Sequence, residues 1–231
     1  MRQIGWYAAL LLAVVVIGCS GPGAQAVDPV NVLRQAGQAM AGLRSVTADV
    51  KFGPGITLQG LTLTSATSKI AVPGASDTVF KVKQGDFLLD VRIVTTGGHV
   101  YIRLPFAQFT ELSPAQAREV PDLSALFDRR AGLPTVLTAG RSTTALGEEQ
   151  AGGVDCDKVG TTYTASQVGQ LLSGRQPAGD IHATVWVGRS DHYVRRVVLS
   201  GPLVDAGKVV QVQVDLRDFN QPVAVATPVA A

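Results

Sequence analysis

The sequence predicts an α+β protein in which a large, mostly antiparallel β-sheet is covered on one face by few helices. Three features predict this fold. Apolar and polar residues alternate with a period of two over most of the chain, one segment near the start has helical periodicity, and glycine pairs separate several of the alternating segments. An open sheet of many strands tends to curl. Its apolar concave face must then be covered by the helices or by something that is not protein.

Residues 29–43 are predicted to form the main helix. Asp28 can cap its start, and Pro29 suits the first helical position. Apolar residues then recur at helical spacing, at Val32, Leu33, Ala36, Ala39, Met40 and Leu43. From Ser45 the period changes to two, which predicts a strand that ends before Gly53.

The rest of the chain continues this alternation, with one interruption. Gly97 and Gly98 separate two alternating segments and predict a hairpin. The alternation stops after Pro105, so residues 114–139 are expected to form short helices and loops. Further strands are predicted over residues 58–70, 78–84, 86–96, 99–104, 142–148, 154–163, 181–188, 193–200 and 208–218, with a short helix over 165–173 and a disordered tail over 224–231.

The first residues are typical of a lipoprotein signal. A single Arg2 precedes an apolar run over residues 7–17, which is shorter than the ~20 residues that span a bilayer. The sequence Val16-Ile17-Gly18-Cys19 then reads as a lipobox, in which the cysteine sulfur accepts a diacylglycerol and the chain is cut before the cysteine. The alternatives are an ordinary secretory signal with an incidental cysteine and an uncleaved anchor.

We therefore expect residues 1–18 to be removed and Cys19 to become an S-diacylglycerol cysteine with an acylated amino group, for example by palmitate. Residues 19–28 would form a flexible tether. The acyl chains would hold the protein at the extracytoplasmic face of the cell membrane.

Composition and motifs exclude several other classes. The net charge is only +2 and no basic stripe is present, so no nucleic-acid partner is expected. The chain has two cysteines and three histidines without ligand spacing, so no metal and no cofactor are expected. With Cys19 acylated, Cys156 has no disulfide partner and is expected to be buried. No G-x-S-x-G, H-E-x-x-H or phosphate loop is present, and no catalytic residue or enzyme activity is predicted.

Several stretches, taken in order and spacing, resemble one known family. They are Leu43-Arg44-Ser45-Val46, the segment 128–137 with Gly132-Leu133, Gly147-Glu148-Glu149 before Gly152-Gly153-Val154, Ala183-Thr184-Val185-Trp186-Val187, His192-Tyr193-Val194-Arg195, and the segment 215–223. Together they resemble the LppX/LprAFG lipoproteins of mycobacteria and relatives over about residues 29–223. The sequence departs from the family in residues 105–113, which lack tryptophan, and at Leu126-Phe127-Asp128.

The resemblance implies a strongly curved antiparallel half-barrel over residues 29–223, similar to the LolA and LolB proteins, with helices over its concave face and a large apolar cavity. It also implies a function. Members of the family bind acylated lipid or glycolipid and help to move it from the cytoplasmic membrane through the cell envelope. The expected partners are the lipid ligand and the membrane, and a membrane lipid transporter is a further candidate.

The apolar face of the strands predicted over residues 78–84, 86–96 and 99–104 is expected to line that cavity. A dry cavity suffices for an acyl chain, because each buried methylene contributes ~0.8 kcal/mol. The residues expected to line it are Phe80, Phe87, Leu89, Val91, Ile93, Val100, Ile102 and Leu104. For any single one of them ordinary core packing is the favoured alternative, since alternation does not distinguish a filled core from a lined cavity. The alternative function is an envelope interaction or regulatory lipoprotein with a filled core and no lipid cargo.

Overall fold

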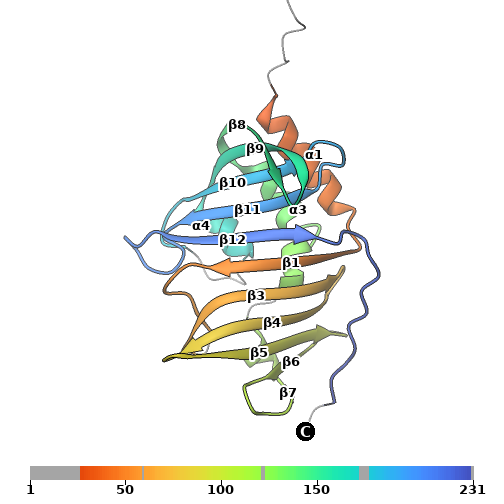
Figure 1. Cartoon of the computed structure of the whole chain (residues 1–231), viewed down its shortest axis with the longest axis vertical. Helices are drawn as coiled ribbons and strands as arrows, with labels where there is room; N and C mark the ends of the chain where they lie inside the picture. Colours follow the sequence, from red (N-terminus) through yellow and green to blue (C-terminus); the bar gives the residue numbers. More distant parts are fainter. Residues whose placement is uncertain (1–26, 59, 121–122, 172–176, 230–231) are drawn as a thin grey trace, which may run out of the picture.

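The computed structural model describes residues 27–58, 60–120, 123–171 and 177–229 (Figure 1). Within these residues a single sheet of twelve strands dominates, and its neighbouring strands run antiparallel. The strands are β1 (Ser45–Phe52), β2 (Thr57–Leu58), β3 (Leu61–Ala71), β4 (Ala75–Gln84), β5 (Phe87–Thr96), β6 (His99–Arg103), β7 (Thr110–Glu111), β8 (Arg141–Ala151), β9 (Val154–Tyr163), β10 (Ile181–Gly188), β11 (Val194–Gly201) and β12 (Val210–Arg217).

The order of the strands shows two meanders joined by one pair. The order along the sheet is β7-β6-β5-β4-β3-β1-β12-β11-β10-β9-β8, with β2 attached to β3. Among the residues that the structure describes, only the pairing of β1 with β12 connects the two halves, with Ala48 opposite Leu216. The outer strands are β7, which has two residues, and β8, whose register shifts twice against β9. Short and bulged edge strands discourage pairing with other chains.

The predicted elements are confirmed with small shifts of their ends. The main helix, α1, covers Pro29–Ala41, and the Asp28 side chain accepts a hydrogen bond from the Val30 backbone N–H at 3.0 Å. The expected strand over residues 58–70 is divided into β2 and β3, with Gly60 between them at a φ of 79°. Glycine adopts this left-handed conformation without steric cost.

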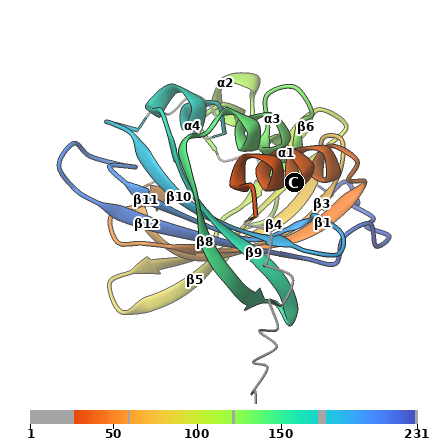
Figure 2. The same cartoon turned by 90° about the horizontal axis from the view of Figure 1, so that it is seen from above.

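The chain between the two edges of the sheet covers its concave face. Because β7 and β8 are at opposite edges, the connection after β7 has to pass from one edge to the other. It contains the short helices α2 (Pro114–Ala117) and α3 (Leu133–Val136) and the 3-10 helices η1 (Leu123–Phe127) and η2 (Leu137–Ala139). Seen from above, α1, α2, α3 and α4 (Ala165–Leu171) lie on the same side of the curved sheet (Figure 2). None of the described helices is long and apolar enough to cross a bilayer.

Two apolar clusters lie between the sheet and these helices. The first cluster is formed by α1, η1, α3, η2 and α4 with the concave face of β9–β12, and it includes Leu33, Phe127 and Val197. The second cluster lies on β3–β6 and includes Phe80 and Ile93. Leu123 and Val214 pack against both clusters, so the two are continuous beneath η1.

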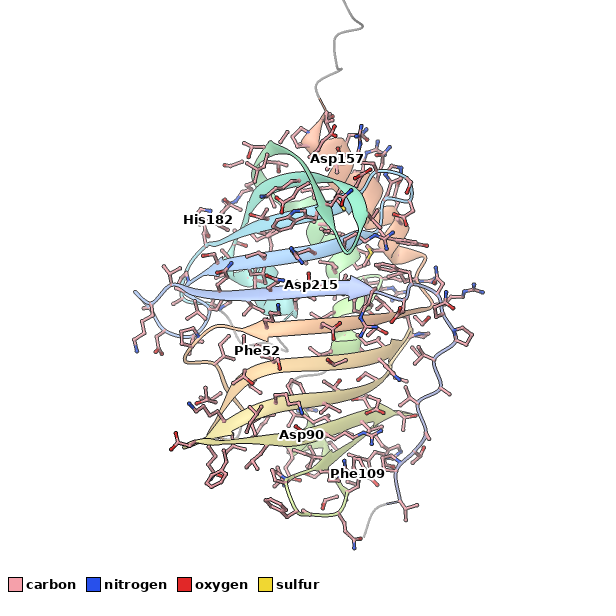
Figure 3. The ribbon with its side chains drawn as sticks, viewed as in Figure 1. Phe52, Asp90, Phe109, Asp157, His182 and Asp215 are labelled. Carbon is pink, nitrogen blue, oxygen red and sulfur yellow. The ribbon has the colours of Figure 1, made fainter. Side chains whose placement is uncertain are left out.

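The convex face carries polar contacts across the junction of the two halves. Arg217 on β12 donates a hydrogen bond from Nε to Asp49 Oδ2 on β1 at 2.8 Å, and Thr67 on β3 donates to Asp49 Oδ1 at 2.7 Å. Arg196 and Asp215 pair in the same way between β11 and β12 at 2.5 Å. In Figure 3, Asp215 lies near the middle of the sheet beside β1.

Gly37 allows α1 and α3 to approach closely. A Cβ atom at this position would lie 2.7 Å from the Pro134 carbonyl oxygen, which is closer than real contacts allow. We expect Gly37→Ala to lower the free energy of unfolding by about 1–2 kcal/mol, in spite of the higher helix propensity of alanine, because the backbone of α3 must move. Gly42→Ala is the control, since its Cβ would make an ordinary 3.4 Å contact. Urea titration measures both, and equal stabilities would contradict the close approach.

The junction at Asp49 also predicts a dependence on pH. Partial burial raises the pKa of Asp49, but hydrogen bonds from Arg217 and Thr67 and the charge of Arg217 outweigh this effect and hold the pKa below its ordinary value. A depressed pKa in the folded state stabilises the protein above about pH 4 and loses this effect as the pH falls through the folded value. Asp49→Asn should therefore lower stability by about 0.5–1 kcal/mol at pH 7. The difference from wild type should disappear at lower pH in parallel chemical denaturation series.

Candidate ligand cavity

A small cavity lies between one half of the sheet and the helices above it. Its volume is about 70 Å³. Its floor comes from β10, β11 and β12, where Val185, Val197 and Val214 are opposite one another on successive strands. Tyr163, the last residue of β9, completes the wall. The remaining lining residues are Leu199 and Leu216 from the floor and Leu126, Phe127, Leu133, Val136, Leu137, Val168 and Leu171 from the covering helices.

The chemistry of the wall is apolar. Twelve of the thirteen lining residues are valine, leucine or phenylalanine, and Tyr163 is the exception. No charged side chain is among them. Such a wall offers an apolar ligand dispersion contacts and exclusion of water, but no counter-charge for an ionised group.

Tyr163 is held in place by its neighbours on both sides. A Cβ at Gly140 would lie 2.2 Å from Thr161 Oγ1 and 3.2 Å from a ring carbon of Tyr163, so glycine allows the chain after η2 to pass close to both residues. Beyond the ring, Thr164 caps α4, since its hydroxyl accepts a hydrogen bond from the Gln167 backbone N–H at 3.3 Å. The Gln167 side chain in turn donates to the Ala139 carbonyl at 2.9 Å and fastens α4 to η2.

The helices over the cavity are short. α3 has four residues, η1 has five and α4 has seven. Isolated helices of this length are unstable in water, so their position depends on packing against the first cluster and on local hydrogen bonds. One such set is at Asp128, whose carboxylate accepts from the backbone N–H groups of Arg130 and Ala131 at 2.8 Å each. These hydrogen bonds hold the pKa of Asp128 below its ordinary value.

The eight residues expected to line a cavity are elsewhere, and none of them contacts this one. Six belong to the second cluster: Phe80, Val91, Ile93 and Ile102 are buried, and Leu89 and Val100 are half-buried against them. Phe87 and Leu104 are corrections, because they are 74% and 44% exposed. Phe87 directly follows the β4–β5 turn and Leu104 lies just beyond the end of β6, so neither is beneath the covering helices.

Several residues with charged or reactive side chains lie away from the cavity. Lys81 pairs with Asp90 at 2.7 Å, and the Arg92 guanidinium binds the Asp77 carboxylate. Cys156 is fully buried in a small third cluster with Trp186, and burial raises the pKa of its thiol. In the described part of the chain, no cluster of His, Cys, Asp and Glu is placed to hold a metal ion. Cys19 lies outside the described residues.

Comparison with known proteins identifies the family. The sequence matches the family described as LppX_LprAFG lipoprotein over residues 28–225. The lipoarabinomannan carrier protein LprG of Mycolicibacterium smegmatis is 25% identical over 172 residues, which are 73% of this chain and 67% of that protein. The crystal structure of LppX from Mycobacterium tuberculosis is 26% identical with a TM-score of 0.63, and covers 87% of this chain and 100% of its own.

The fold of a further relative agrees. The crystal structure of LprF from Mycobacterium bovis superposes with a TM-score of 0.69 at 20% identity, covering 87% of this chain and 96% of its own. The curved antiparallel sheet with helices over one face is therefore the architecture of these proteins. The chain belongs to the LppX_LprAFG lipoprotein family.

Proposed function

We propose that this protein is a membrane-anchored lipoprotein that binds an acylated lipid or glycolipid and helps to transfer it through the cell envelope. The observation that carries the proposal is the apolar cavity under a cover of short helices. The relative described as a lipoarabinomannan carrier supports it. Acyl chains need an apolar site of this kind and little specific chemistry.

The cavity has to widen to admit a chain. Its volume of about 70 Å³ is several times smaller than the 300–1,000 Å³ typical of ligand sites. We infer that the acyl chain lifts η1, α3 and α4 from the floor. Burial of about a dozen methylenes contributes roughly 10 kcal/mol before costs. The free energy of burying the acyl chain offsets the packing that is lost when these three short helices, which have few hydrogen bonds to the sheet, move away from it.

The second cluster is the proposed continuation of the site. Leu123 and Val214 contact both clusters, so a chain that displaces η1 from the first would next meet the second. Phe80, Val91 and Ile102 would then line its far part. In this way the six buried or half-buried residues singled out from the sequence belong to the proposed site as its extension.

The anchor places the site near its source of lipid. We propose that Cys19 carries the acyl groups, as the signal predicts. At about 3.3–3.6 Å per residue, the segment from Cys19 to Asp28 spans at most about 30 Å. The covered concave face would then remain within reach of the cytoplasmic membrane that supplies the ligand.

The cargo can be tested by extraction and mass spectrometry. The acylated full chain, purified from a lipid-rich host, is expected to release close to one non-covalent acyl lipid per protein, while the lipid on Cys19 stays attached. Val197→Phe places a ring in the cavity and should lower the amount several-fold. Val198→Phe is the matched control, because Val198 packs against the third cluster with Trp186 on the other face of β11.

Circular dichroism and thermal unfolding would establish that both variants fold. Wild-type protein that releases no lipid would refute the carrier and favour an interaction or regulatory lipoprotein with a filled core. Equal cargo in Val197→Phe and Val198→Phe would refute this cavity as the binding site.

The anchor has its own test. Cys19→Ala removes the sulfur that receives the diacylglycerol, so the precursor should stay unprocessed or the protein should leave the membrane. Inhibition of the lipoprotein peptidase in the wild type should also leave residues 1–18 attached, in a precursor that differs from Cys19→Ala because it already carries the diacylglycerol. Unchanged size and membrane association of Cys19→Ala would show that another segment holds the protein.

A further inference from the structure

The large hydrophobic side chains that stay exposed are concentrated at one end of the strands. Among the described residues, nine such side chains are at least 44% exposed, and six of them lie at the connections of this end. The turns at the opposite strand ends, residues 72–74, 97–98, 152–153 and 189–193, contain none of the nine. Single exposed apolar residues are common, but their concentration at one end marks a contact surface. The six are Phe87, Leu88, Leu104, Phe106, Val204 and Val209.

Four of these residues form what we call the apolar rim: Phe87 and Leu88 at the β4–β5 turn, and Val204 and Val209 in the β11–β12 loop. Both views show these two connections, in yellow and in blue, on the left side of the molecule (Figures 1 and 2). Only β3 and β1 separate β4 from β12, which corresponds to about 15 Å at the usual spacing of strands. One flat surface can therefore touch both connections.

The end of the β4–β5 hairpin is apolar on both faces. Phe87 is opposite Gln84 and Leu88 is opposite Lys83. Neighbouring residues of a strand point to opposite faces of the sheet, so these two apolar side chains point in opposite directions. They are 74% and 61% exposed. Packing of the covering helices on the concave face explains neither of them.

The rim adjoins the apolar interior of the domain. In the β11–β12 loop, Leu203 packs against the first cluster. Between the two connections of the rim, Phe52 and Ile56 pack against the second cluster. Leu199, two residues before the end of β11, lines the cavity. Apolar side chains therefore extend from the exposed rim to both clusters beneath the helices.

We propose that the apolar rim enters the interfacial region of a phospholipid bilayer, so that this end of the sheet faces the membrane. The inference rests on the membrane anchor of the proposed function, and it does not need a lipid in the cavity. The charges beside the rim fit this location. Lys83, next to Leu88, has no ion pair within the described residues, and Lys208 pairs with Asp205 at 3.2 Å. Such groups can remain among the headgroups while apolar tips lie below them.

A bilayer fits the rim better than a partner protein does. A standard protein interface buries about 800 Å² on each partner in one well-packed patch. Four side chains on two separate connections do not form such a patch, whereas a fluid surface adapts to separate tips. The anchor at Cys19 would also hold the domain beside the bilayer at a high effective concentration, so a weak contact of the rim suffices.

Tryptophan placed on the rim reports its contact with lipid. The acylated full chain is bound at low density to vesicles of phosphatidylcholine and phosphatidylglycerol. In Leu88→Trp and Val209→Trp the added emission should move to shorter wavelengths, and brominated phospholipid should quench it. Leu146→Trp is the matched control, because this leucine is 51% exposed in the middle of the edge strand β8. Its quenching should be several-fold weaker. Trp186 is buried and gives the same background in all variants.

Circular dichroism would establish that the three variants fold. Equal quenching in Leu88→Trp and Leu146→Trp, or none in Val209→Trp, would overturn the rim contact and leave the anchor and the cargo standing. A wavelength shift that grows with the number of chains per vesicle would show contact between copies of the chain, which also overturns it. Chains that fail to float with the vesicles would overturn the rim contact together with the anchor.

Discussion

The pairing of β1 with β12 is the constraint on which the rest of the structure depends. Each half of the sheet is a simple meander of consecutive hairpins, and only this pair joins the halves into one surface. Once they are joined, β7 and β8 occupy opposite edges, and the segment between them has to cross the concave face. The cover over the sheet is thus a consequence of strand order. The polar contacts of Asp49 and Arg217 stabilise the junction from the convex side.

The sheet and the short helices that cover it are held by different interactions, so one fold can combine a stable scaffold with an adaptable site. The strands are tied by continuous ladders of hydrogen bonds, whereas the covering helices have three to seven residues and depend on side-chain packing. Local opening occurs most readily where few such bonds must break. Of the six helices over the concave face, α1 is by far the longest, with 13 residues, and Gly37 leaves room for its close contact with α3.

Much of this architecture could be predicted from the sequence, because a strand with one buried face leaves a period of two and the hairpin turns carry glycine. The position of the cavity could not be predicted. The same alternation is present in both halves of the sheet, at Val91 and Ile93 in one and at Val197 and Val214 in the other. The path of the covering segment decides over which half a cavity forms. That segment has no clear periodicity. Phe87 shows a second reason why the sequence did not place the cavity. It has the same alternation as the buried residues of β5, but it is the first residue of that strand and is exposed.

The strands of the β1–β12 pair come from nearly the two ends of the domain, and Asp49 and Arg217 are 168 residues apart. Contacts between such distant residues form late in folding because a long loop must close first. Until β12 is available, β1 lacks its neighbour on one side and the two meanders remain separate. The domain therefore cannot complete itself from its N-terminal part during synthesis. The two meanders can join into one sheet only after the last strand has left the ribosome.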